Sequence, residues 1–214
     1  MSLDDIKYGN PAKEHKDAVE ADKAGILKAC MDKGIIKDII ENHPFPTNSS
    51  DETRNELDYL VELMGDVDDE DFKFCYLLEM HHYDFLAVVG KKLGLDVDGK
   101  MVKELCSNTN PVLFYLKDVF DRPRPYQLAK ELNLPIFPII RTDANSAAYP
   151  SGHTLDFLVT LYHFGKMKPE AAEEIDEFYH EIKRVRELSG VHYPSDRKVS
   201  EYLFKQLVKH NLIK

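Results

Sequence analysis

Two histidines of this chain, His153 and His192, stand in short segments whose neighbouring residues could equip an imidazole for chemistry. The segment around His192 reads Arg186-Glu-Leu-Ser-Gly-Val-His192-Tyr-Pro-Ser-Asp196. A helical pattern stops near Gly190 and another starts near Asp196, so the Asp196 carboxylate can reach the His192 ring N–H. A carboxylate behind an imidazole sets its tautomer and leaves the other nitrogen free to attack. The alternative interpretation is a surface histidine hydrogen-bonded to an aspartate at a helix start.

The segment around His153 reads Tyr-Pro-Ser-Gly-His-Thr and opens a strongly patterned apolar stretch, which predicts a helix over Ser151–Lys166. A helix N-terminus offers free N–H groups and a positive dipole end, and both favour an anion. Ser151 could cap the helix and donate its hydroxyl, while Gly152 allows close approach of the backbone. His153 would lie in the first turn, facing whatever those N–H groups hold. The alternative is an ordinary helix cap with an incidental histidine.

A third segment, Lys117-Asp-Val-Phe-Asp-Arg-Pro-Arg124-Pro125, follows a predicted helix over Pro111–Phe120. Lys117 would lie in the last turn, and Arg124 in the extended chain that the prolines impose. Two cations fixed in this way suit a multiply charged oxyanion. Basic residues near a helix C-terminus also simply complement its dipole, which is the alternative. Arg122 is out of register with this pair, so we assign it to the surface or to the rim of a substrate site.

Together the segments supply the parts of a site for one tetrahedral oxyanion. Three cations could hold its oxygens, namely Lys117, Arg124 and Arg186. Two neutral donors, Ser151 and Gly152, could assist them. The two imidazoles, His153 and His192, could act on opposite sides of a phosphorus atom. The 214-residue chain has 28 Lys and Arg against 38 Asp and Glu, a net charge of −10. So acidic a chain has little general reason to gather such a cluster.

The three motifs, in order, resemble the tripartite signature of the type 2 phosphatidic acid phosphatase (PAP2) superfamily. The matching positions are K-x6-R-P at Lys117, Arg124 and Pro125, P-S-G-H at Pro150–His153, and R-x5-H-x3-D at Arg186, His192 and Asp196. This superfamily includes soluble class A acid phosphatases, lipid phosphate phosphatases and vanadium haloperoxidases. The longer tract Ala147–Thr154 is most similar to the class A enzymes. These commonly have Gly-Ser where Ala147 and Ala148 stand here, and the superfamily usually has Ser at Val185.

The resemblance implies a phosphatase that works through a phosphohistidine. In that mechanism His192 attacks phosphorus, Asp196 holds its ring, and His153 protonates the leaving alcohol and then activates water. The remaining signature groups stabilise the equatorial oxygens, and these are Lys117, Arg124, Ser151, Gly152 and Arg186. No metal and no cofactor is required, because side-chain cations take the role of a divalent ion. Members of the superfamily can also pass the phosphoryl group to an alcohol other than water.

Composition narrows the expected partners. A net charge of −10 and a pI near 5.4 disfavour a general binder of nucleic acid or of an anionic membrane. No transmembrane run or secretory signal is recognisable, and the cysteines Cys30, Cys75 and Cys106 lack pairing or metal spacing, so we expect a cytoplasmic protein. Lipid phosphatases of the superfamily place their site between membrane helices. The expected substrate here is therefore a small soluble phosphate ester, and the resemblance also implies a homodimer.

Two other functions compete with this one. A vanadium haloperoxidase would hold vanadate with the same residues and bond His192 to the metal, although such enzymes are generally much longer. A ferritin-like di-iron protein is suggested by two Glu-x-x-His motifs, at Glu79–His82 and Glu177–His180. Acidic helix faces with incidental histidines would produce the same pattern. A catalytically inactive binding module is disfavoured because the proton-transfer residues are present.

Helical periodicity dominates the chain, without strand alternation, and predicts an all-α, single-domain bundle (1–214) of about eight helices with a PAP2/haloperoxidase-like core. The N-terminal helices (1–107) carry no recognised motif, and the catalytic motifs occupy 117–196. The expected helical segments are Ala18–Ile40 with a break at Gly34, Ser50–Met64, Asp71–Leu93, Asp98–Cys106, Pro111–Phe120, a turn at Gln127–Leu132, Ser151–Lys166, Pro169–Leu188 and Ser195–His210.

Overall fold

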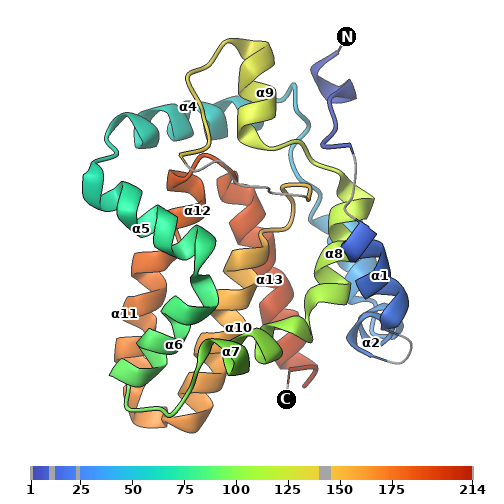
Figure 1. Cartoon of the computed structure of the whole chain (residues 1–214). Helices are drawn as coiled ribbons and strands as arrows, with labels where there is room; N and C mark the ends of the chain where they lie inside the picture. Colours follow the sequence, from blue (N-terminus) through green and yellow to red (C-terminus); the bar gives the residue numbers. More distant parts are fainter. Residues whose placement is uncertain (1, 10–12, 23–24, 140–145, 214) are drawn as a thin grey trace.

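Helix α10 (Gly152–Met167), which begins within the Pro-Ser-Gly-His segment, runs through the middle of the molecule (Figure 1). The computed structural model describes residues 2–9, 13–22, 25–139 and 146–213. Leu155 and Val159 of α10 pack into one apolar cluster, while Phe157 and Phe164 pack into another. A helix that is apolar around its circumference has to be buried on all sides. The two clusters therefore make α10 the common wall of two cores.

Helix α13 (Pro194–Lys209) lies beside α10 and runs in the same direction, so both N-termini lie at the upper end in Figure 1. The Ser151 N–H donates to the Asp196 carbonyl at 3.2 Å, and the Ser200 hydroxyl donates to the Ser151 carbonyl at 2.9 Å. These bonds join the two helix beginnings. The positive ends of two helix dipoles consequently point to one region.

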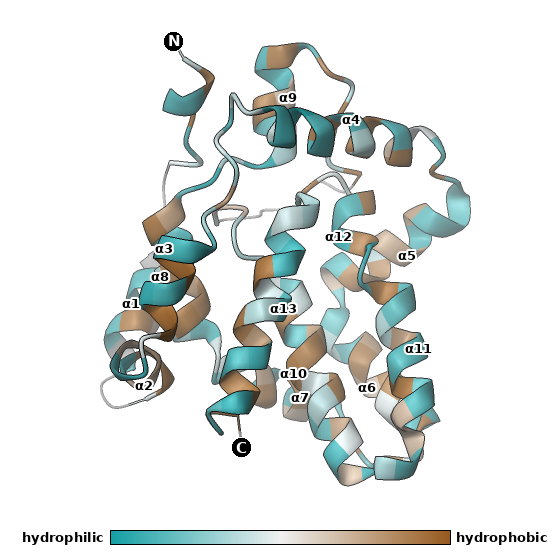
Figure 2. Ribbon diagram, turned by 180° about the vertical axis from the view of Figure 1, so that it is seen from behind, coloured by the Kyte–Doolittle hydropathy of each residue, from teal (hydrophilic) through white to brown (hydrophobic). Residues whose placement is uncertain are grey.

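The other helices cover the α10–α13 pair from two sides and from its upper end (Figure 1). The core around Phe157 and Phe164 is completed by α5 (Asp69–Met80), α6 (His82–Lys92), α7 (Gly99–Ser107), α11 (Ala172–Ile182) and α12 (Val185–Leu188). The opposite side holds α1 (Lys13–Ala21), α2 (Ile26–Asp32), α3 (Ile35–Asn42) and α8 (Asn110–Phe120). The upper end is covered by α4 (Asp51–Gly65) and α9 (Pro125–Leu132), and the short 3-10 helices are η1 (Leu3–Asp5) and η2 (Pro169–Ala171). Hydrophilic and hydrophobic residues alternate around the outer helix α11 (Figure 2).

The all-α class predicted from periodicity is confirmed, and the described residues contain no strand. They form thirteen α-helices rather than about eight, because several expected helices are interrupted. Gly34 adopts a positive φ of 73°, which separates α2 from α3. His81 (φ −138°, ψ 31°) leaves helical geometry, yet its N–H still bonds Leu77 and its carbonyl still accepts from Phe85. The chain thus changes direction between α5 and α6 while both backbone groups of His81 keep their hydrogen bonds.

Several helices begin and end within one residue of their predicted bounds, and side-chain caps fix the starts of α4 and α7. Ser50 caps α4 through the Thr53 N–H at 3.2 Å, and Asp98 caps α7 through the Met101 N–H at 2.8 Å. The turn expected at Gln127 is a longer helix, α9, that begins at Pro125. The last helix begins at Pro194, one residue before the predicted start at Ser195, because proline is favourable at the first helical position.

All three cysteines are buried and free. Within the described residues, none of the helices combines the length and the apolar character needed to cross a bilayer.

Gly90 sets how closely α6 approaches α10. A β-carbon at this position would lie 2.8 Å from Phe164 Cζ and would also collide with Val97. We expect Gly90→Ala to lower the free energy of unfolding by about 1–3 kcal/mol in urea titrations, although alanine has the better helix propensity. Gly65→Ala is the matched control, because nothing lies within 4 Å of its β-carbon position. A Gly90→Ala protein as stable as the Gly65→Ala protein would contradict this packing.

Candidate active site

His192 lies between α12 and α13 and is 2 % exposed. Its Nδ1 is 2.9 Å from Asp196 Oδ2, as the spacing of the motif predicts, and its Nε2 is 2.8 Å from Arg124 Nη1. The carboxylate accepts a hydrogen bond and the guanidinium donates one, so the two partners fix a neutral ring with its proton on Nδ1. Nε2 therefore carries the lone pair, as the motif predicts. In this structure, however, that lone pair accepts a hydrogen bond from Arg124.

The surroundings of His192 keep its ring neutral. Burial lowers the pKa of His192 well below its ordinary value, and the charges of Arg124, Arg186 and Lys117 lower it further. An imidazole among cations is a poor base toward the proton, yet it still presents a lone pair to an electrophile. These three charges also show that the predicted cations gather around His192.

Lys117 and Arg124 are buried cations that meet only neutral acceptors among the described residues. The Lys117 ammonium donates to the Ala147 carbonyl at 2.5 Å. The Arg124 guanidinium donates to the carbonyls of Ser146 and Val191 at 2.8–3.0 Å, as well as to His192. Burial lowers the pKa of each cation, and for Lys117 the charge of Arg124 adds to this effect. A bound anion would offset both the burial of these charges and the repulsion between them, because it supplies the missing opposite charge.

Arg186 differs from the other two cations because it forms an ion pair. Its guanidinium contacts the carboxylate of Glu79 on α5, and both side chains are nearly buried. Burial lowers the pKa of Arg186 to about 9. Its Nε is buried without a hydrogen-bond partner, so this guanidinium still has one donor to offer.

The beginning of α10 is arranged differently from the predicted cap. Ser151 occupies the N-cap position, but its side chain caps no backbone N–H and instead accepts a hydrogen bond from the Thr154 hydroxyl at 3.0 Å. At Gly152 a β-carbon would lie 3.1 Å from Leu113 Cδ2, so the missing side chain lets α10 pack closely on α8. The backbone N–H groups of the first turn remain the neutral donors that the motif provides.

His153 lies in the first turn of α10, as predicted, and its ring packs on that of His82 with the centroids 4.2 Å apart. Its Nε2 is buried without a hydrogen-bond partner. Burial lowers the pKa of His153 well below its ordinary value, and His82, Arg124 and Lys117 act in the same direction. The side chain thus belongs to the same electrostatic cluster as His192.

Arg122 was expected at the surface, and this prediction is wrong. The side chain is fully buried and donates to Asp196 Oδ1 at 2.6 Å, to Ser195 Oγ at 2.7 Å and to Glu56 Oε2 at 3.0 Å. Its guanidinium also lies 3.7 Å from the centroid of the Tyr193 ring. A sequence signal for this position existed: in extended chain, residues two apart point to the same side, so Arg122 turns inward with Arg124.

His15 is a site neighbour that no motif indicated. Its ring stacks on Phe114 of α8 with centroids 3.9 Å apart, and its buried Nδ1 has no hydrogen-bond partner. Burial lowers the pKa of His15 to about 4, and the charges of Lys117 and Arg124 contribute. The N-terminal helix α1 therefore brings a further imidazole to the edge of the cation pair.

The residues of the di-iron alternative do not assemble as a metal centre. The described residues contain no group of three His, Cys, Asp or Glu side chains that could hold a metal ion. Glu79 is paired with Arg186, whereas the exposed His180 lies 3.5 Å from Asp176. The two Glu-x-x-His motifs consequently serve separate parts of the fold.

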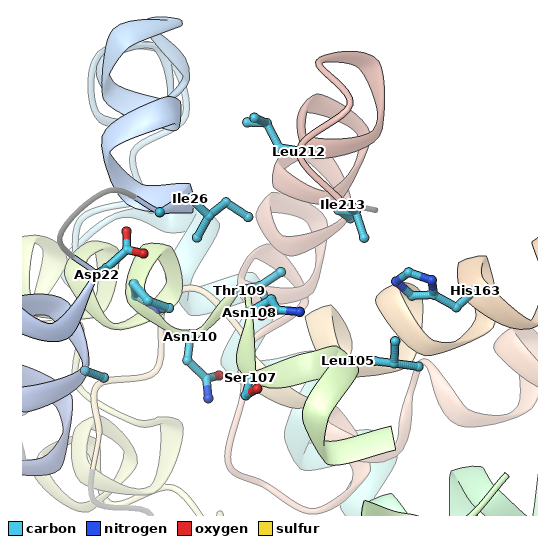
Figure 3. Close-up of a pocket in the computed structure, with 13 residues that line it drawn as sticks. Asp22, Ile26, Leu105, Ser107, Asn108, Thr109, Asn110, His163, Leu212 and Ile213 are labelled. Carbon is cyan, nitrogen blue, oxygen red and sulfur yellow. The ribbon is translucent and has the colours of Figure 1, made fainter. Parts of the chain in front are cut away.

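A pocket of about 570 Å³ opens elsewhere, at the other end of the bundle (Figure 3). It is lined by Asn110 at the start of α8 and by Leu212 and Ile213 beyond the end of α13. The signature residues lie at the opposite ends of these two helices. The pocket in Figure 3 is therefore separate from the His192 cluster.

Comparisons with known proteins add a distant likeness to solved structures. No protein-family model and no curated protein matches the chain. A solved structure of a transmembrane PAP2-type phosphatidylglycerolphosphate phosphatase from Bacillus subtilis is 15 % identical, with 92 % of each chain covered and a TM-score of 0.36. At this identity and score, the likeness establishes neither a shared fold nor a shared activity.

Removal of Arg122 would expose the dependence of this region on its buried ion pairs. In Arg122→Met the carboxylates of Asp196 and Glu56 lose their cation while staying buried, so we expect a loss of about 3–5 kcal/mol in the free energy of unfolding. Adding Glu56→Gln should recover part of that loss, because one uncompensated charge disappears. Urea titrations of the single and double variants check this. A single variant within about 1 kcal/mol of wild type would contradict it.

The depressed pKa of His15 makes stability depend on pH. The unfolded chain takes up a proton on His15 near pH 6.5, whereas the folded chain does so only near pH 4. Stability is therefore lost as the pH falls through this window, by about 1.4 kcal/mol per pH unit for this residue. His15→Phe keeps an aromatic ring on Phe114 and cannot titrate. Urea titrations at pH 6.5 and pH 5 measure how much free energy of unfolding each protein loses between the two pH values. That loss should be smaller in His15→Phe than in wild type by about 2 kcal/mol. Equal losses in the two proteins would contradict the assignment.

Proposed function

We propose that this protein is a phosphatase of the PAP2 superfamily that hydrolyses a small phosphomonoester through a phosphohistidine on His192. One observation carries the proposal: the Nε2 lone pair of a neutral His192 lies beside Arg124 and near Lys117, two buried cations without a carboxylate partner among the described residues. This combination of an unprotonated nucleophile and unneutralised positive charge suits a phosphate dianion. The order of the three motifs supports the same conclusion.

In the proposed complex, Lys117 and Arg124 bind two phosphate oxygens, and the N–H groups at the start of α10 bind a third. Arg124 moves one N–H from His192 Nε2 to the phosphate, which releases the lone pair at the moment it is needed. Arg186 donates a hydrogen bond to the phosphate from its unpartnered Nε, while Glu79 holds the far end of the guanidinium in place. Side-chain cations supply the charge that a divalent ion supplies in other phosphoryl-transfer enzymes, so the reaction needs no metal.

The reaction then proceeds in two displacements. The His192 lone pair forms a bond to phosphorus as the ester P–O bond breaks, and its electron pair leaves on the alcohol oxygen, which takes a proton from His153. Asp196 stabilises the positive charge that develops on the His192 ring. In the second step His153 removes a proton from water, the water oxygen attacks phosphorus, and the P–N bond breaks to restore neutral His192.

The protonation states require an acid-shifted activity. His153 has to enter the first step protonated, although burial and the nearby charges lower its pKa. A bound dianion offsets the repulsion from Lys117 and Arg124, so substrate binding itself favours the protonated ring. His192 stays neutral under the same conditions, because its contact with Arg124 opposes a proton on Nε2.

The proposed substrate is a polar ester, such as a nucleotide, a sugar phosphate or an inositol phosphate. The net charge of −10 repels the chain from anionic membrane surfaces, which favours a substrate that is free in water. The homodimer and the cytoplasmic location expected from the sequence stay predictions.

Turnover of p-nitrophenyl phosphate in the presence of a chelator tests the proposal. We expect activity in the wild type and a loss of at least about 10³-fold in His192→Ala, because the nucleophile is absent. His153→Ala should accumulate phosphoenzyme with this substrate, because p-nitrophenolate leaves without a proton. His180→Ala is the matched control, as an exposed histidine outside the cluster.

Two results would contradict the proposal. Near-normal phosphatase rates in His192→Ala would exclude the nucleophile. Bromide oxidation with peroxide and vanadate, in a protein without phosphatase activity, would favour the haloperoxidase alternative.

A further inference from the structure

A second imidazole–carboxylate pair lies directly behind His153. His82 begins α6, and its Nε2 is 3.3 Å from Oδ2 of Asp156, which follows His153 by three residues on α10. The His82 ring packs on the His153 ring, with centroids 4.2 Å apart and planes tilted by 56°. Helix α10 therefore carries both His153, the proposed acid, and Asp156, the carboxylate next to His82.

This pair has unmet polar groups that the packing of the fold does not account for. Nε2 of His153 and Oδ1 of Asp156 are buried without a hydrogen-bond partner, and the 3.3 Å contact of His82 Nε2 with Asp156 lacks the geometry of a hydrogen bond. The side chains of His82 and Asp156 are only 15 % and 10 % exposed. Buried polar groups are normally satisfied, and those that are not concentrate where function requires them.

Charged and titratable groups surround the pair from each neighbouring helix. Tyr83 of α6 lies 3.8 Å from the His82 ring, and burial together with the charge of Asp156 raises the pKa of its hydroxyl. Cys106 of α7 contacts the Asp156 carbonyl through its thiol. The charges of Lys117 and Arg124 also act on His153, and His153 in turn acts on the ring of His192.

We propose that His82, anchored by Asp156, is a positioning residue that holds the His153 ring for proton transfer to the leaving oxygen. This inference rests on the proposed phosphatase function and extends it to a residue outside the three motifs. His82 touches no reacting atom. It fills the space into which the His153 ring would otherwise rotate, and the Asp156 carboxylate restrains it in turn. The proton moves from His153 to the departing oxygen, and His82 takes no part in the transfer.

Such a role makes the effect of His82 depend on the leaving group. An alkoxide is a strong base and leaves phosphorus only when it is protonated, so an alkyl phosphate depends on a well-placed His153. p-Nitrophenolate is a weak base and leaves without a proton. A purely structural role for His82 would lower the rates on both substrates to the same extent.

The experiment compares ethyl phosphate with p-nitrophenyl phosphate across a small set of variants. We expect His82→Leu to lower kcat/KM, which reports only the steps up to release of the alcohol, by about 10- to 100-fold on ethyl phosphate, with a much smaller change in kcat/KM on p-nitrophenyl phosphate. His82→Gln keeps an N–H that can reach Asp156 and should recover part of the loss. Asp156→Asn should show the same leaving-group dependence in a weaker form. His180→Leu, in the other Glu-x-x-His motif, should leave both rates unchanged.

A second measurement does not require turnover. NMR titration of the His153 ring should give a higher pKa in His82→Leu than in wild type, because the charge of His82 no longer acts on it. Equal losses on the two substrates in folded variants, or an unchanged His153 pKa, would overturn the positioning role. A wild-type protein inactive on both esters would overturn the proposed function and its catalytic use of His82. The NMR result would then show separately whether the two rings interact.

Discussion

The buried carboxylate of Asp196 is the group on which the rest of the site depends. One oxygen accepts from His192 Nδ1 and from the Tyr193 N–H, and the other accepts from Arg122. Its backbone carbonyl accepts from Ser151 and so joins α13 to α10. Burial raises the pKa of this carboxyl, and the Arg122 guanidinium opposes that effect. The same residue therefore fixes the tautomer of His192 and the meeting point of two central helices.

Charge is distributed unequally around His192. The carboxylates of Asp196 and Glu56 lie on its Nδ1 side, where Arg122 balances them. Arg124 lies on its Nε2 side, the charge of Lys117 also acts on the ring, and both cations meet only neutral oxygens and the imidazole in the described part of the chain. This asymmetry sets the polarity of the ring, because a proton is favoured on one nitrogen and an anion beside the other. It also shows how a protein with a net charge of −10 can hold unneutralised positive charge in its interior.

The two cores that share α10 determine which side chains can support the site. α6 packs against α10 at Gly90 and Phe164, and this contact places the first residue of α6, His82, against His153. α5 ends near Arg186 and supplies Glu79, while α4 supplies Glu56. The segment without a recognised motif thus contributes the second layer of charges and imidazoles around the signature residues.

The sequence by itself determined the helical class, most helix boundaries and the identity of the clustered motif residues. It could do so because periodicity, caps and short-range spacing act within a few residues of the chain. The contact between His192 and Asp196 is local in this sense, since four residues separate them. The tertiary structure alone decided that Arg122 meets Glu56 and Asp196, that Glu79 pairs with Arg186 and that His82 and His15 join the cluster. Those contacts link residues far apart along the chain, and only the packing of distant helices brings them together.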